Sequence, residues 1–351
     1  MGASPGVLPP SIVGSLPKPA WLAEPNVLRA AWRLSGPALA EAQDDAVRLA
    51  LEDQEDAGLA VVTDGEIRRR HYIWGFLDGL TGTDTERLTT KRARGGRYSE
   101  LTEVARLIGP VERRAPVFVD ACRFSRAHTA KALKVTLPGP MTIADSVADE
   151  AGGADFQSLA MRFARILNAE ARDLVEAGAD IVQFDEPCFN VYLDEVAAWG
   201  IEALEIAMDG VAARRAVHIC YGYGTPVVLK WKSQNTDWGH YGVSLPLLAK
   251  SSVHQVSVET AASGVDVAVL ETLAGKDVLV GVVDVGNDEV EEVAVIAERI
   301  RRVLPFVDPA RLHPCTDCGL VPRTRFAAAG KMRALAQAAA LVRAEIEAKH
   351  A

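Results

Sequence analysis

The sequence has no run of about 18 uncharged apolar residues, which is the length that a membrane-spanning helix needs. Residues 1–10 lack the basic start and the apolar core of a secretory signal. The formal net charge is −9, whereas a protein that binds nucleic acid or an anionic membrane needs a basic surface. We therefore expect a cytoplasmic protein that acts on small molecules, with no nucleic-acid partner and no membrane partner.

Cysteine is scarce, and its count of five is odd. An odd count in a chain expected in the cytoplasm does not suit a disulfide framework, so the count favours metal binding or thiol chemistry. The composition is 49% hydrophobic and 24% charged, which is typical of a soluble protein with a large core. The cysteines are Cys122, Cys188, Cys220, Cys315 and Cys318.

Eight short apolar runs with β-forming residues follow one another along the chain, and helical patterns separate most of them. The clearest helical patterns cover 37–57, 156–177, 288–304 and 324–348. Alternation of strand and helix favours a parallel sheet, and eight is the strand number of a (β/α)₈ barrel. We predict an α/β fold with a single TIM barrel domain over residues 1–351. The eight runs are 11–15, 60–66, 132–140, 181–187, 216–222, 255–260, 277–284 and 311–319.

Two connections are too long for a single crossover, and we expect both to lie over the C-terminal face of the barrel. Residues 67–131 form a polar, arginine-containing stretch. Residues 223–254 are rich in aromatic side chains and include Trp231 and Trp238. Long loops of this kind often form a lid or a substrate wall, so we expect the two tryptophans to line the donor pocket.

Each apolar run ends in polar or reactive residues. In a barrel the carboxyl ends of the strands form the active-site face, so these side chains should converge at one mouth. The alternative is that acidic residues at strand ends only cap the helices that follow. The residues at the run ends are Ser15, Asp64, Glu66, Asp185, Glu186, His218, Cys220, Glu259, Asp284, Cys315 and Cys318.

His218 and Cys220 alternate on one predicted strand, so both side chains should point to the same face. Together with Glu259 and the pair Cys315 and Cys318, they make a set of nitrogen, sulfur and oxygen donors that suits Zn²⁺. The alternative is a group of buried thiols beside a core histidine, because free cysteine is among the most buried residue types. The pattern favours the zinc site.

Six motifs in order along the chain resemble the catalytic half of the cobalamin-independent methionine synthase family, and more closely its short single-module homologues. The resemblance covers nearly the whole chain and implies a barrel enzyme that binds zinc and methylates homocysteine. The family's zinc ligands then fall on His218, Cys220, Glu259 and Cys318, and Cys315 becomes a neighbour of the ligands or an alternative one. The motifs are SIVGSLPKPAWL, VVTDGEIRR, LPGPMT, IVQFDEPCFN, VHICYGYG and PCTDCGLVPR.

The resemblance also implies homocysteine contacts at Ser15, Glu66 and Asp185. Two carboxylates can hold an α-ammonium group, and the Gly-Ser turn can donate hydrogen bonds to a carboxylate. These three residues favour homocysteine over a thiol such as coenzyme M, which is the alternative acceptor. A zinc- and thiol-binding protein without turnover is a third interpretation.

One departure concerns the methyl donor. The long family members carry an Asp-Ile-His triplet whose histidine helps to protonate the departing folate, whereas this chain has Asp284-Val285-Gly286. The N-terminal half of those enzymes is also missing. Asp284 is therefore the residue expected to orient the donor or relay a proton. The donor candidates are a methylated corrinoid protein, a methyl-folate or another methyl compound.

Overall fold

The computed structural model describes residues 6–350, and within this range the central feature is a curled sheet of seven parallel strands. Its spatial order, β1-β4-β6-β7-β8-β9-β10, follows the chain order. Neighbouring strands are parallel throughout, so a connection must return across the sheet after each strand. The strands are β1 (Val61–Thr63), β4 (Ala132–Pro138), β6 (Ile181–Asp185), β7 (Arg214–Ile219), β8 (Gln255–Glu259), β9 (Asp277–Val283) and β10 (Leu312–Thr316).

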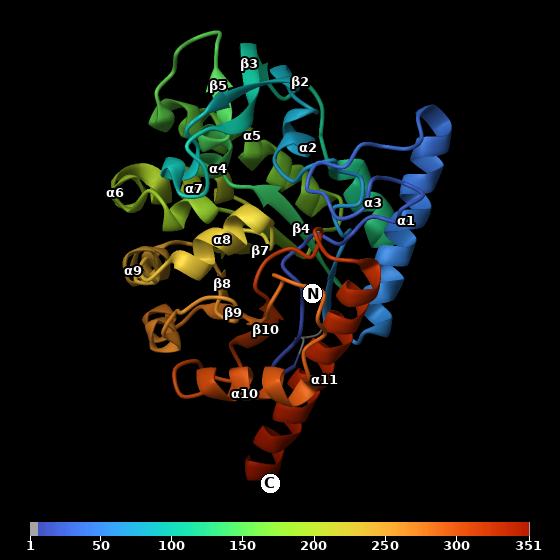
Figure 1. Ribbon diagram of the computed structural model, residues 1–351, viewed down its shortest axis with the longest axis vertical. Coiled ribbons are helices and arrows are strands. Elements are labelled where there is room, and N and C mark those ends of the chain that lie inside the picture. Colours follow the sequence, from blue (N-terminus) through green and yellow to red (C-terminus); the bar gives the residue numbers. More distant parts are fainter. Residues whose placement is uncertain (1–5, 351) are drawn as a thin grey trace.

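The four predicted helices are present and lie outside the sheet. They are α1 (Gly36–Asp56), α5 (Phe156–Glu176), α10 (Val293–Val303) and α11 (Arg325–His350), with α11 running beside α1 (Figure 1). Only α10 starts clearly later than predicted. The Glu291 side chain is the reason, because it accepts the Asp284 N–H and pairs with Lys331, which holds the residues before the helix in a loop.

The first predicted strand, 11–15, is not a regular strand in the structure. The segment nevertheless lies between β1 and β10, since Ala60 donates to the Pro10 carbonyl and Ser11 donates to the Pro314 carbonyl. Several of its backbone groups bond to side chains of Thr63, Lys134, Gln183 and Thr316. Lys134 Nζ, for example, donates to the Ile12 carbonyl at 2.6 Å. Side chains have thus replaced much of the backbone ladder that would define a strand.

The first long connection contributes a hairpin to a second sheet. Within 67–131, β2 (Thr81–Lys91) and β3 (Thr102–Glu112) pair as an antiparallel hairpin. The third strand, β5 (Val147–Asp149), comes after this connection and joins β3 in parallel. These three strands lie together at one end of the molecule (Figure 1). The same connection holds α2 (Trp74–Leu77), η1 (Arg94–Gly96) and α3 (Val119–Ala127).

The second long connection, 223–254, is also structured. It consists of α8 (Pro226–Gln234) and α9 (Tyr241–Lys250). In residues 6–350 no helix has the length and apolar character required to cross a bilayer. The remaining elements are α4 (Pro140–Asp145), η2 (Pro187–Asn190), α6 (Leu193–Glu195), η3 (Val196–Gly200), α7 (Ile201–Met208) and η4 (Val267–Leu273).

Candidate metal and substrate site

The strand ends bring four of the predicted residues to the same end of the sheet. Asp185 at the end of β6 is paired with His218 on β7, and His218 is paired with Ser257 on β8. Cys220 directly follows β7 and Cys318 follows β10. The carboxyl ends of these strands therefore supply one cluster, as expected for a parallel sheet whose loops form the site.

His218, Cys220 and Cys318 form a compact, fully buried group whose potential ligand atoms all lie within 4.8 Å of one another. The two sulfur atoms are 3.6 Å apart and the cysteines are free thiols. Two sulfurs bonded to one tetrahedral ion at about 2.3 Å would be separated by about 3.8 Å. The sulfur pair therefore already has the spacing of two ligands of a tetrahedral metal ion.

The imidazole of His218 is oriented for the same role. Its Nδ1 lies 2.9 Å from the Ser257 hydroxyl. Its Nε2 is buried and has no hydrogen-bond partner among residues 6–350. A metal-binding histidine commonly uses its second nitrogen for such an outer contact, so the set of donors fits an ion such as Zn²⁺.

Sharing a hydrogen bond with Cys318 lowers the pKa of the Cys220 thiol well below its usual value. A thiolate is the form that binds metals and reacts as a nucleophile. The cluster is therefore prepared to take up a cation.

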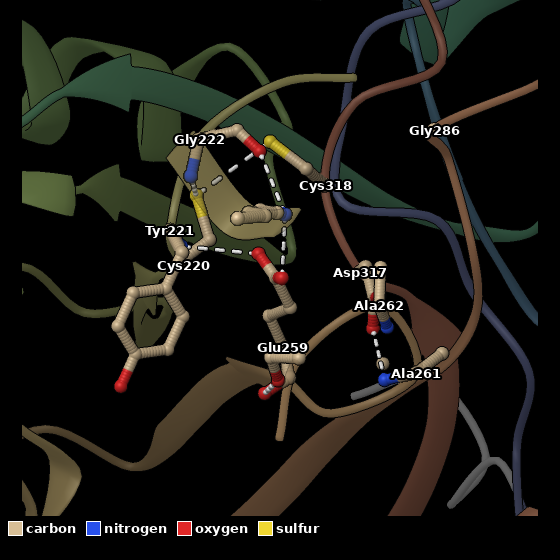
Figure 2. A network of polar contacts seen from close by, with 12 residues as sticks. Cys220, Tyr221, Gly222, Glu259, Ala261, Ala262, Gly286, Asp317 and Cys318 are labelled. Carbon is tan, nitrogen blue, oxygen red and sulfur yellow. Dashed lines mark hydrogen bonds and ion pairs between the residues drawn. The ribbon is translucent and has the colours of Figure 1, made fainter. Parts of the chain in front are cut away.

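Glu259 lies beside this group but outside it. Its Oε1 accepts a hydrogen bond from Lys232 Nζ at 2.5 Å, and its Oε2 accepts one from the Tyr221 N–H at 3.0 Å. Figure 2 shows Cys220 and Cys318 directed toward each other, with the Glu259 carboxylate alongside. The structure thus places the fourth predicted ligand next to the cluster and pairs it with a lysine.

Cys315 is not brought to the cluster. Its sulfur lies 3.7 Å from the Ser11 hydroxyl, and its side chain packs with Val13 and Leu279. Of the two cysteines in the CxxC motif, only Cys318 reaches His218. Asp317 between them accepts the N–H groups of Ala261 and Ala262, which ties the turn after β8 to the end of β10 (Figure 2).

A cavity of about 580 Å³ adjoins the cluster, and its lining includes Ser15, Glu66 and Asp185 together with His218, Cys220 and Cys318. Small-molecule sites usually measure about 300–1,000 Å³, so this cavity has room for an amino acid and part of a second molecule. The structure therefore unites the predicted homocysteine residues with the sulfur cluster in one space.

The three polar residues of this cavity have distinct environments. Glu66 has a positive φ of 55° and accepts a hydrogen bond from the Thr136 hydroxyl at 2.7 Å. Burial raises the pKa of Asp185 to about 7. The Ser15 hydroxyl is buried and has no protein partner in the described part of the chain. A strained backbone at Glu66 and an unpaired hydroxyl at Ser15 are typical of positions shaped for a ligand.

The two predicted wall tryptophans belong to an aromatic group around Tyr221. Trp231 and Trp238 pack against Tyr221, which follows Cys220, with ring centroids 6.1 and 5.0 Å from the tyrosine. Neither belongs to the described lining of the cavity. Their place beside Tyr221 supports the residues that hold the cluster.

Asp284 is likewise not brought to the cavity lining as described. Its carboxylate accepts the Gly286 N–H at 2.6 Å and the Asn287 side-chain amide at 3.3 Å. The side chain therefore stabilises the turn after β9.

Several cavity residues come from the first long connection, where the sequence showed only a run of arginines. Arg94 pairs with Asp145 at 2.6 Å, and Tyr72 and His71 line the cavity beside it. His71 Nδ1 lies 3.3 Å from the Ile73 N–H, and burial lowers the pKa of the imidazole to about 3. These residues depend on how the connection folds back, for which no local motif gives a signal.

Comparison with known proteins gives concordant matches over nearly the full length. The family model for the catalytic domain of cobalamin-independent synthase matches residues 8–341. Curated methionine synthases of Sulfurisphaera tokodaii and Saccharolobus solfataricus are 31% and 32% identical, covering 98% of this chain and 95% and 97% of those proteins. The solved B12-independent methionine synthase from Shewanella sp. W3-18-1, in complex with selenomethionine, is 42% identical with a TM-score of 0.94, covering 98% of this chain and 100% of that one.

Proposed function

The chain belongs to the cobalamin-independent methionine synthase family, and from this premise we propose that it transfers a methyl group to the thiol of homocysteine to form methionine. Methionine synthases are methyltransferases, and the chain covers its curated relatives almost completely. The observation that carries the proposal is the group of His218, Cys220 and Cys318, which opens on the same cavity as Glu66 and Asp185.

We propose that His218, Cys220 and Cys318 hold Zn²⁺, with Glu259 as a fourth and weaker ligand that the substrate can replace. The unpaired Nε2 and the sulfur spacing support this assignment. When bound, the ion would keep the homocysteine sulfur deprotonated and hence nucleophilic at neutral pH. The Ser257 hydroxyl would keep the His218 ring in its ligating orientation.

The rest of the cavity would position homocysteine. Glu66 and Asp185 would hold the α-ammonium group, and the free Ser15 hydroxyl would donate to the α-carboxylate. A coenzyme M-like thiol has no ammonium group for these two carboxylates. The buried carboxylates therefore favour an amino-acid thiol as the acceptor.

We also propose that residues 10–16 occupy the eighth position of a (β/α)₈ barrel and that the chain is one domain. The hydrogen bonds of this segment to both β1 and β10 support closure of the sheet. Ser15 would then reach the site from the same end as the strand termini. The tryptophans and Asp284 would act indirectly, by supporting Tyr221 and the turn at Gly286.

Complementation of a methionine auxotroph, grown with and without cobalamin, tests the function in the cell. Purified protein tests the site, because Glu66→Gln and Asp185→Asn should weaken homocysteine binding in calorimetry without loss of zinc. Wild-type protein that binds zinc and homocysteine but forms no methionine with any methyl donor would instead be a binding protein without turnover. Loss of zinc in the Glu66 and Asp185 variants would contradict the division of roles.

A further inference from the structure

Lys18 is a buried cation without a direct partner among the described residues. It is 6% exposed, and its Nζ makes no hydrogen bond and no ion pair with residues 6–350. The Nζ lies 6.0 Å from the centre of the Trp32 ring, at the outer limit of a cation–π contact. Burial lowers the pKa of Lys18 to about 8, although Glu66 and Asp64 raise it through space. Because a buried charge without a partner is unfavourable, Lys18 suits a negatively charged ligand.

Two prolines set the direction of this side chain. Lys18 lies between Pro17 and Pro19, and all three residues are buried. Proline fixes its own φ and favours an extended backbone in the residue before it, so residues 17–19 form a stiff segment. Pro17 and Pro19 line a narrow space next to α1 and α11. Successive side chains of an extended segment point to opposite sides, so Lys18 faces away from these helices.

On that other side Lys18 lines a small recess of the substrate cavity. The recess and the cavity share several wall residues, including Ser15, Glu66, His71 and Tyr223. The free volume of the recess is about 10 Å³, which accommodates about one water-sized group and not a whole ligand. The recess therefore suits one end of a molecule whose other end occupies the cavity.

Glu66 lines the same recess but does not close an ion pair with Lys18. Its carboxylate accepts a hydrogen bond from the Thr136 hydroxyl at 2.7 Å and lies 3.8 Å from Arg69 Nη1. A carboxylate and an ammonium group that line one recess without meeting are complementary to a zwitterion, which can pair with both. The Ser15 hydroxyl, which has no partner in the described part of the chain, can donate to the carboxylate of the same ligand.

On the basis of the proposed function, we propose that Lys18 is a specificity-determining residue that binds the α-carboxylate of the acceptor. Glu66 and Asp185 alone would accept any small aminothiol, because they recognise only an ammonium group. Lys18 adds the requirement for a carboxylate, since an aminothiol without one would leave the buried lysine unpaired. The recess thus restricts the acceptor to amino-acid thiols.

L-Methionine is a suitable probe, because it carries the ammonium and carboxylate groups but no thiol that could bind zinc. Calorimetry should compare it with 3-(methylthio)propylamine, which lacks only the carboxylate. Wild-type protein should prefer methionine. In Lys18→Met the affinity for methionine should fall about 10–100-fold, the range expected for one charge-assisted hydrogen bond, whereas the affinity for the amine should not fall. Lys18→Arg keeps the charge and should retain part of the preference.

A crystal structure of the wild type with methionine gives a direct readout. Lys18 Nζ should lie about 2.7–3.2 Å from an oxygen of the bound carboxylate. A carboxylate bound elsewhere in the cavity, out of reach of Lys18, would overturn the proposal.

Lys18→Met should fold, because the substitution leaves no hydrogen-bond partner of Nζ unpaired, and Lys18→Gln gives a second uncharged variant. Lys276→Met is the control. The Lys276 Nζ donates to the Ser251 and Val253 carbonyls before the start of β9, at the opposite end of the sheet from the site, so neither affinity should change.

The outcomes separate the two proposals. Wild-type protein that binds neither methionine nor homocysteine would refute the proposed function itself. A well-folded Lys18→Met protein that keeps wild-type affinity for methionine, or that loses affinity equally for methionine and the amine, would refute only the role of Lys18.

Discussion

The sulfur atoms of Cys220 and Cys318 lie 3.6 Å apart, although 98 residues separate the two cysteines in the sequence. Cys315 is only three residues from Cys318, yet its sulfur faces Ser11. Proximity along the chain is therefore a poor guide to which thiols act together. The pair forms because the segments that follow β7 and β10 meet at the same end of the sheet.

Replacement of these thiols should separate ligands from neighbours. Loss of a residue that only supports a ligand typically lowers metal affinity about 10–100-fold. Cys220→Ala and Cys318→Ala should each lower zinc affinity by more than this, because each removes a ligand. Cys315→Ala should retain zinc, because its sulfur lies in an apolar group with Val13 and Leu279. Metal analysis after purification without chelators measures all three. Zinc loss in Cys315→Ala but not in Cys318→Ala would assign the ligand of the CxxC motif to Cys315.

Ser257 should matter for metal binding although it is not a ligand. Its hydroxyl lies 2.9 Å from His218 Nδ1 and keeps the ring oriented. Ser257→Ala should therefore weaken zinc binding by about 10–100-fold, measured by competition with a chelator. Ser244→Ala removes another buried hydroxyl, which donates to the His240 carbonyl, so it is the control and should bind zinc normally. Equal zinc affinity in the two variants would show that His218 needs no such support.

The donor preference follows from Gly286, which cannot give a proton where the long family members have a histidine. Asp284 is engaged by the Gly286 N–H, so it is poorly placed to act as the missing acid. General acid assistance is commonly worth about 10²–10⁴-fold in rate. We expect methyltetrahydrofolate to be a very slow donor and methylcobalamin to be faster, in parallel rate measurements with homocysteine. Faster turnover of the polyglutamate folate would show that Asp284 or water supplies the proton.

Acid should destabilise the protein partly through His71. Burial lowers the pKa of His71 to about 3, whereas the unfolded imidazole titrates near its usual value of 6.5. The unfolded state therefore binds the extra proton between these pH values, and stability present above pH 6.5 is lost as the pH falls. This loss amounts to at most about 1.4 kcal/mol per pH unit.

Urea unfolding at pH 7.5 and pH 5.0 measures this loss. His71→Gln keeps an acceptor for the Ile73 N–H and should lose less stability on acidification than the wild type. His128→Gln alters an exposed histidine and should behave like the wild type. Identical acid sensitivity of wild type and His71→Gln would remove His71 as a cause.

The parallel sheet and most of its strands were predictable because each strand is a short apolar run bounded by turn residues. Alternation along β7 also predicted correctly that His218 and Cys220 share one face, since side-chain direction in a strand has a period of two. The segment 11–15 could not be assigned correctly in this way. Its apolar pattern is that of a strand, but side chains such as Lys134 take its backbone hydrogen bonds.

The sequence alone did not reveal which partner each side chain contacts. Glu259 has the position of a ligand at the end of its strand, yet its ion pair depends on Lys232, which lies in a separate helix. The density of aromatic residues in 223–254 predicted a cavity wall, but it did not reveal that Trp231 and Trp238 pack against Tyr221. Such choices depend on how two distant segments fold against each other, which neither composition nor periodicity encodes.

The bonds that join the segment 10–16 to β10 have a consequence for biosynthesis. Ser11 donates to the Pro314 carbonyl and Leu320 donates to the Ser15 carbonyl, so this segment is held by one that leaves the ribosome much later. Cys318 lies in that late segment. A nascent chain that has not yet released residue 318 lacks both the second sulfur and the anchor of Ser15. The proposed metal site is therefore complete only after β10 and the turn that follows it have left the ribosome.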